Sequence, residues 1–170
     1  MTQVWGFPPI SRPDARILIL GSMPSRQSLA RRQYYAHPRN AFWPILCALL
    51  DIEAGSYELR VAQVMQKGVA IWDVLQTCFR SGSLDSAIDD RTVVANDFQA
   101  FFRDHRRIKG VFFNGAKAET VYRKHVLPTL SGTAASLRLQ RLPSTSPAHA
   151  GMTLEQKKAA WQVLIPDIVE

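Results

Sequence analysis

Four short apolar runs stand out along the chain, each followed by a polar turn or by a helical pattern. They are Arg16–Leu20, Val69–Val74, Gly110–Phe113 and Leu137–Leu142. Runs of this length without polar alternation are typical of strands that are buried on both faces of a parallel sheet. The pattern therefore predicts four parallel strands.

Apolar residues at helical spacing predict helices between and after these strands. The segments are Ala41–Asp51, Leu59–Gln66, Asp97–His105, Ala116–Val126 and Leu154–Leu164. Alternation of strands and helices is typical of an α/β fold with helices on both faces of the sheet. We therefore predict a three-layer α/β/α sandwich with a short, roughly four-stranded parallel sheet. Because 170 residues is an ordinary domain length, we expect residues 1–170 to form a single domain.

The charge balance favours an anionic partner but does not decide the function. The chain has 21 Lys and Arg residues against 14 Asp and Glu residues, a formal net charge of +7. A basic balance suits nucleic acid, but it is also common in proteins that never bind DNA. No apolar run is long enough to cross a membrane, and early prolines do not suit a signal peptide. We expect a monomer of the cytoplasm, in a bacterial-type cytosol or nucleoid, with no membrane association.

Cysteine and histidine spacing argues against a metal or cofactor. Cys47 and Cys78 are the only cysteines, and both lie in apolar surroundings. Two cysteines cannot hold a four-cysteine iron-sulfur cluster, and the four histidines show no ligand spacing. We expect two core thiols, no metal and no cofactor.

Candidate chemistry gathers in the loops that follow the predicted strands, beginning at Gly21, Asp73, Asn114 and Pro143. Open parallel sheets bind ligands beyond the carboxyl ends of their strands. After the first strand, residues 33–43 (QYYAHPRNAFW) crowd aromatic, basic and amide side chains ahead of a helix. Stacking surfaces beside hydrogen-bonding groups suit a base that has been extruded from nucleic acid.

This segment resembles a motif of the uracil-DNA glycosylase superfamily, in particular its hypoxanthine-DNA (deoxyinosine) glycosylase branch. Matching blocks run in order along most of the chain: GSMP (21–24), QYYAHPRNAFW (33–43), GVAIWDVL (68–75), GSLDS (82–86), FFNG (112–115) and LPSTSPA (142–148). The resemblance implies a uracil-DNA glycosylase-like fold. It also implies a base-excision DNA repair enzyme that flips out a deaminated base, above all hypoxanthine, and hydrolyses its N-glycosidic bond.

Two positions depart from better-known members of the superfamily. Met23 stands where they have an Asp or Asn that holds water, and Leu142 stands where they have His or Asn. In the hypoxanthine branch both absences belong to the pattern, and the resemblance moves catalysis to Asn40. An amide can accept from a water while it donates to the sugar or base. Asn40 could equally cap the helix that begins near Ala41, and the two roles are compatible.

The resemblance also implies which residues bind the base: Gly21, Ser22, Met23, Tyr35, Asp73 and Asn114. Tyr35 is similar in position to the aromatic residue that stacks on the flipped base in relatives, and Tyr34 would line the same side of the pocket. Alternatively, both rings belong to the hydrophobic core. An Asp73 carboxylate would accept from N1–H of hypoxanthine and repel N1 of adenine. Alternatively Asp73 caps a helix or pairs with Arg80. Asn114 either contacts the base or is a turn residue, and the Asn-Gly sequence favours the turn.

The last loop resembles a proline and serine loop that grips the DNA backbone in relatives, so we expect it to bind DNA. The expected contacts are Pro143, Ser144, Thr145, Ser146, His149 and Arg39. Ala148 would be a small wedge, which favours mismatched or single-stranded substrates. Further basic residues bracket the crevice or are solvated surface: Arg26, Arg31, Arg32, Arg138 and Arg141. Three lysines, Lys124, Lys157 and Lys158, are expected on solvated helix faces.

Two other functions remain open at this stage. A pocket that admits hypoxanthine could admit uracil or xanthine, which would make the enzyme a uracil or broad deaminated-base glycosylase. Because Met23 replaces the familiar catalytic carboxylate, a non-catalytic nucleic-acid-binding α/β module is the second alternative. No lysine lies in the matching blocks, which favours a monofunctional glycosylase, although Lys109 and Lys117 keep a lyase open.

Overall fold

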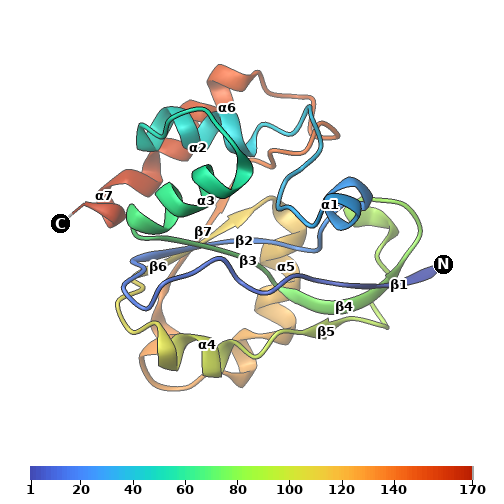
Figure 1. Cartoon of the computed structure of the whole chain (residues 1–170). Helices are drawn as coiled ribbons and strands as arrows, with labels where there is room; N and C mark the ends of the chain where they lie inside the picture. The colour runs from blue at the N-terminus through green and yellow to red at the C-terminus, as the bar shows by residue number, and fades with distance from the viewer. Residues whose placement is uncertain (170) are drawn as a thin grey trace.

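The computed structural model describes residues 1–169, and its centre is a four-stranded parallel sheet (Figure 1). The strands lie in the order β3 (Val69–Asp73), β2 (Ile17–Gly21), β6 (Gly110–Asn114) and β7 (Arg138–Leu142). Each neighbouring pair runs parallel. The predicted sheet is confirmed, and each strand bound lies within one residue of that expected.

The register of the sheet places the carboxyl ends of the strands side by side, and polar residues lie at or just after these ends. Gly21 lies opposite Asp73, and Asn114 lies opposite Leu142. Parallel pairing therefore brings four separate loops to one edge of the sheet, because all four strands end there.

Helices cover both faces of this sheet (Figure 1). One face carries α2 (Phe42–Leu50), α3 (Tyr57–Gln66), α6 (Leu154–Trp161), η4 (Gln162–Leu164) and α7 (Ile165–Ile168), and the other carries α4 (Phe98–Asp104) and α5 (Ala116–His125). Alternate residues of β2 enter different cores: Ile17 and Ile19 pack with α2, whereas Leu18 and Leu20 pack with α4 and α5. The three predicted layers are confirmed.

A second, antiparallel sheet was not predicted. It consists of β1 (Thr2–Trp5), β4 (Leu75–Arg80) and β5 (Val94–Ala95), in the order β1-β4-β5. Its central strand begins two residues after β3 ends, so one apolar stretch of sequence contains two strands in different sheets.

The remaining short elements were not predicted either: α1 (Arg26–Arg31), η1 (Asp85–Ala87), η2 (Leu127–Thr129) and η3 (Gly132–Ser136). Helix α1 begins at a serine cap, with Ser25 Oγ accepting from Ser28 N at 3.2 Å. Within residues 1–169 no helix has the length and apolar character required to cross a bilayer.

Candidate active site

A cavity of about 710 Å³ lies at the edge where the four parallel strands end. It brings together most of the predicted site residues: Gly21, Ser22, Met23, Tyr35, Asn40, Asp73, Asn114, Ser144, Thr145, Ser146 and His149. Pro143 is not part of its lining, and Arg39 lines a smaller neighbouring hollow that Asn40 and His149 share. Residues from Gly21 to His149, which span most of the chain, therefore form one site.

Asp73 and Tyr35 close over the backbone of Gly21 at the base of this cavity. A Cβ atom at Gly21 would lie 2.5 Å from Asp73 Oδ1 and 2.9 Å from the Tyr35 hydroxyl. The glycine is therefore required by close approach of two functional side chains. Asp73 is 3% exposed, and its Oδ2 has no hydrogen-bond partner. Arg80, the alternative partner of Asp73, donates instead to the Pro24 carbonyl at 2.6 Å.

The carboxyl of Asp73 has an unusual proton affinity. Burial raises its pKa to about 7, and the negative charge of Asp85 adds to this effect, while Arg80 opposes it. A buried carboxyl without a hydrogen-bond donor loses the solvation that normally stabilises its charged form. An acidic side chain that lies in a cleft and has a strongly shifted pKa is typical of a functional residue.

Asp85 is a site residue that the sequence interpretation missed. It lines the cavity from η1, and its Oδ1 accepts a hydrogen bond from Ser22 Oγ at 2.5 Å. The available signal was its position in the GSLDS block, where it is the one carboxylate among small and apolar residues.

The two adjacent tyrosines have different environments. Tyr34 is buried and donates from its hydroxyl to the Pro8 carbonyl at 2.8 Å, so it belongs to the core. The ring of Tyr35 stacks on Phe42 at 3.8 Å with an interplanar angle of 21°, which covers one of its faces. Burial, followed by the charge of Asp73, raises the pKa of Tyr35, so its hydroxyl remains a neutral donor. The other face of Tyr35 is the candidate stacking wall.

Asn40 combines a capping contact with a place in the cavity. Its Oδ1 accepts from Phe42 N at 2.9 Å, at the start of α2. Within residues 1–169 its Nδ2 makes no hydrogen bond to protein, and the residue lines the cavity. The amide nitrogen and the second lone pair of the oxygen are therefore free for a substrate or a water.

Asn114 and Thr145 form a reciprocal pair that ties the loops together. Asn114 Nδ2 donates to Thr145 Oγ1 and Thr145 N donates to Asn114 Oδ1, both at 2.9 Å. The Thr145 carbonyl also accepts from Ala41 N at 2.9 Å. Thr145 is only 1% exposed, so the expected DNA contact by its side chain does not fit the structure. We call Asn114, Thr145 and Ala41 the loop knot.

We predict that Asn114→Ala destabilises the chain by roughly 1 to 3 kcal/mol, because it leaves two buried groups of Thr145 without partners. Urea unfolding would measure the loss, with Thr120→Val, at an exposed position of α5, as the surface control. Adding Thr145→Val to Asn114→Ala should cost less than the sum of the single changes. Strictly additive losses would contradict the pairing.

The loop 143–149 packs against α6, and its serines line the cavity. Trp161 Nε1 donates to the Pro143 carbonyl at 2.9 Å. Within the loop, Ser146 N donates to Ser144 Oγ at 3.1 Å. Lys157, expected in solvent, is 5% exposed, with its Nζ 3.5 Å from the Ser146 carbonyl. That expectation was wrong because the lysine lies beneath this loop, where burial lowers its pKa.

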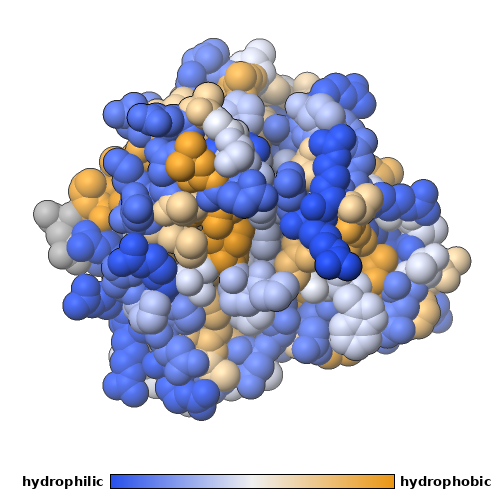
Figure 2. Space-filling view, viewed as in Figure 1, coloured by the Kyte–Doolittle hydropathy of each residue, from blue (hydrophilic) through white to orange (hydrophobic). Residues whose placement is uncertain are grey.

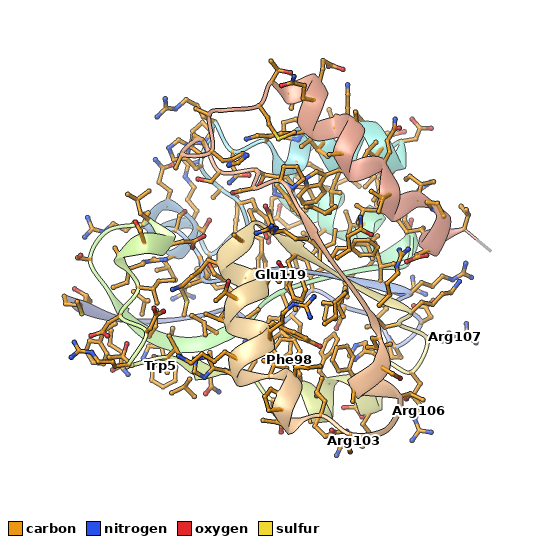
Figure 3. All side chains as sticks on the ribbon, turned by 180° about the vertical axis from the view of Figure 1, so that it is seen from behind. Trp5, Phe98, Arg103, Arg106, Arg107 and Glu119 are labelled. Carbon is orange, nitrogen blue, oxygen red and sulfur yellow. The ribbon has the colours of Figure 1, made fainter. Side chains whose placement is uncertain are left out.

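Basic residues do not all surround the cavity. Arg26 lines it, and hydrophilic side chains gather over α1 (Figure 2). Arg138 lies at the amino end of β7 and pairs with Asp167, while Arg141 lies 3.6 Å from Glu119 on α5 (labelled in Figure 3). Neither arginine lines the cavity, which favours the alternative that both are solvated surface charges.

A further basic group lies at the opposite edge of the sheet. Arg103, Arg106 and Arg107 project near the end of α4 and the loop that enters β6 (Figure 3). Because this loop precedes a strand, it is remote from the edge that carries the cavity. Net charge alone would therefore not have located the site.

The described residues also define which groups could support other chemistry. Within residues 1–169 no three His, Cys, Asp or Glu side chains are placed to hold a metal ion. Cys78 is buried, whereas Cys47 is partly exposed, so only the first is a core thiol. No lysine of this range lines the cavity, and Lys117 pairs with Asp90 at 2.5 Å.

Comparison with known proteins identifies the family of this chain. The family model of the uracil DNA glycosylase superfamily matches residues 8–165. A hypoxanthine DNA glycosylase of Methanosarcina acetivorans is 33% identical over 94% of this chain and 96% of its own length. Another, from Methanosarcina barkeri, is 35% identical over 66% of this chain and 72% of its own.

A solved structure shows the same architecture. The solution NMR structure of a candidate uracil DNA glycosylase from Methanosarcina acetivorans superposes with a TM-score of 0.74 at 28% identity, covering 96% of this chain and 99% of that one. The matched family model and the shared fold lead to one conclusion. The chain belongs to the uracil DNA glycosylase superfamily.

Proposed function

We propose that this chain, acting as a single-domain monomer, is a monofunctional DNA glycosylase that excises hypoxanthine from DNA. The observation that carries the proposal is the meeting of Tyr35, Asp73 and Asn40 in one cavity of about 710 Å³. Two relatives at 33% and 35% identity bear the name hypoxanthine DNA glycosylase, which supports the same substrate.

Cleavage of the N-glycosidic bond requires stabilisation of a cationic sugar, a departing base anion and a placed water. Asn40 is proposed as the catalytic residue. Its Oδ1, held by Phe42 N, has one lone pair left to orient the water. Its Nδ2 is free to donate to the sugar or to the base as charge develops.

Base recognition is assigned to the cavity floor. The open face of Tyr35 stacks on the purine, a contact worth roughly 1 to 3 kcal/mol. Asp73 faces the N1–H and C6=O edge of hypoxanthine, with Gly21 and Ser22 leaving room for the ring and Met23 giving an apolar contact. Asn114 acts through the loop knot, because both ends of its amide bind Thr145.

Backbone binding is assigned to the rim of the cavity. Ser144, Ser146 and His149 present polar groups from the last loop, and Arg39 adds charge beside them. Such contacts bind phosphate without reading sequence, and they make affinity fall with salt. Pro143 is proposed to stiffen the loop rather than to contact DNA, because it lies outside the cavity lining.

A broader deaminated-base activity is the second candidate. Uracil presents the same N–H and C=O edge as hypoxanthine, so Asp73 could pair with either base. The cavity is large enough for a purine, and a pyrimidine would leave part of the Tyr35 ring uncovered. Hypoxanthine is therefore the better match.

Labelled duplexes that carry hypoxanthine, uracil, xanthine or adenine at one position test the proposal directly. We expect abasic product from the hypoxanthine duplex first, and strand breakage only after alkali, because no lysine within residues 1–169 lines the cavity to act as a lyase nucleophile. If purified protein yields no abasic product from any duplex, the enzyme assignment fails. Faster release of uracil would establish the second candidate.

A further inference from the structure

A second hollow, of about 300 Å³, lies near the amino edge of the parallel sheet, remote from the main cavity that contains Asp73. It opens between the end of α4 and the chain that leads into β7. Among residues 1–169 its lining contains two arginines, Arg103 and Arg106, and no carboxylate. In the main cavity two carboxylates, Asp73 and Asp85, accompany Arg26. The excess positive charge of this chain is therefore not concentrated where the base is expected to bind.

The arginines around this hollow are available to an anion. Arg106 Nε donates to the Arg103 carbonyl at 3.2 Å, which holds the guanidinium and leaves its two terminal nitrogens. Arg106 and Arg107 are both exposed, and neither forms an ion pair with a described residue (Figure 3). Arg103 makes only a 3.6 Å contact with the exposed Asp104. Guanidinium groups with free terminal N–H groups form the bidentate contacts that phosphate favours.

The opposite wall of the hollow supplies neutral hydrogen-bonding groups. Ser131 and Thr133 line it, and their hydroxyls bond to no other group of the described chain. Gln99 Oε1 accepts from Ser131 N at 3.0 Å, which ties this wall to α4 and leaves Gln99 Nε2 able to donate. Hydroxyls and amides beside arginines are typical of contacts to a nucleic-acid backbone, which carry no base-sequence information. The hollow therefore has the chemistry of a phosphate site.

One duplex does not serve both sites, because they lie at opposite edges of the sheet. Strand β6 begins at Gly110, beside the arginines, and ends at Asn114, in the lining of the main cavity. Its five residues span about 16 Å, and the loops at both ends add to this separation. DNA is stiff over about 150 base pairs, so a duplex on the main cavity does not curl round to the amino edge.

We propose that this hollow, together with Arg103, Arg106 and Arg107, binds the phosphate backbone of a second DNA segment. The proposed function supplies the identity of the anion, and the inference rests on it to that extent. The protein then holds two segments at opposite edges of one domain. A glycosylase has to search a large excess of undamaged DNA. With two sites it binds a new segment before it releases the old one, so it transfers directly between them.

Native mass spectrometry of the full chain with an undamaged duplex of about 12 base pairs, little more than one helical turn, counts the bound segments. We expect complexes of one chain with two duplexes. Arg106→Ala should weaken the second binding step and lower its slope of log affinity against log salt by about one, because one phosphate contact is lost. Arg106→Ala/Arg107→Ala should leave one duplex bound.

Transfer itself is measured by dissociation. The release of a fluorescent duplex is followed while unlabelled duplex is added, and its rate should rise with competitor concentration in the unmodified chain but stay constant in Arg106→Ala/Arg107→Ala. The matched control is Lys124→Ala/Lys158→Ala, which removes the same charge from α5 and α6, outside both linings, and should keep the dependence. Single-turnover release of hypoxanthine from a short duplex should be equal in all three proteins.

One bound duplex per unmodified chain, or a competitor dependence that survives Arg106→Ala/Arg107→Ala, would overturn the second DNA site. It would also be overturned if inorganic phosphate or adenosine monophosphate displaced the second duplex at concentrations too low to screen charge, which would indicate a small-anion site. Polyglutamate that bound as tightly as DNA would indicate an acidic protein partner instead. The binding measurements use undamaged DNA, so they still decide the second site if no duplex releases hypoxanthine and the proposed function fails.

Discussion

Asn40→Ala is expected to slow the release of hypoxanthine from DNA by roughly 100- to 1,000-fold, the usual cost of removing one positioned group that stabilises a transition state. The amide is the polar group whose Nδ2 is free in the cavity while its Oδ1 is oriented by Phe42 N. Removing it leaves the water and the developing charge without that partner. Single-turnover excision from a hypoxanthine duplex measures the effect.

The same change removes a helix cap, so stability needs its own control. Loss of the cap costs about 1 kcal/mol, which urea unfolding would detect. Asn40→Ser restores a short capping oxygen but does not supply the amide donor. We expect it to recover stability without recovering rate. An Asn40→Ala rate close to that of the unmodified chain would remove Asn40 from catalysis.

Raising the pH through about 7 is expected to sharpen the preference for hypoxanthine over adenine by roughly tenfold, the worth of about one charged hydrogen bond. Below its pKa of about 7, Asp73 is protonated, and its O–H can donate to N1 of adenine. Above this pH the carboxylate only accepts, so it binds N1–H of hypoxanthine and repels adenine. Competitive inhibition by the two free bases, from about pH 5.5 to pH 8, measures the preference.

Two substitutions separate this effect from other titrations. Asp73→Asn has no proton to lose, so the preference should become flat with pH and weaker above neutrality. Asp85→Asn removes a charge that raises the pKa of Asp73, and the transition should move to lower pH. A preference that responds to pH in the same way in all three proteins would exclude Asp73 as its source.

The titration of Asp73 should also affect stability, which we expect to fall with rising pH while the preference for hypoxanthine increases. Folding raises the pKa of Asp73 from 3.8, so between about pH 4 and pH 7 the folded chain holds a proton that the unfolded chain has lost. The free energy of unfolding should therefore fall as the pH rises through this window. In Asp73→Asn this component, a few kcal/mol at most, should be absent.

The sheet was predictable because it is covered on both faces. Every residue of β2, β3 and β6 is buried, which makes each strand a continuous apolar run in the sequence. The antiparallel sheet gave no comparable signal. Its strand β4 mixes buried and exposed positions without strict alternation, and it follows β3 with a single residue between them.

The site was predictable only in part for a related reason. Residues directly at strand ends, such as Gly21 and Asp73, converge because the register requires it. Burial of Thr145 and Lys157 depends on which side of a loop faces the protein, and local sequence does not specify that. The role of Asp85 depends on a contact with Ser22, 63 positions away in the chain.

The loop knot has a consequence for how this chain folds. Ala41, Asn114 and Thr145 meet only after about a hundred residues of chain have been brought together, so these contacts have high sequence separation. Contacts of this kind require the loop-closure entropy to be overcome before they contribute any energy. The parallel strands must therefore pair before the pocket exists. A partly folded chain can already have native helices and still lack a place for the base.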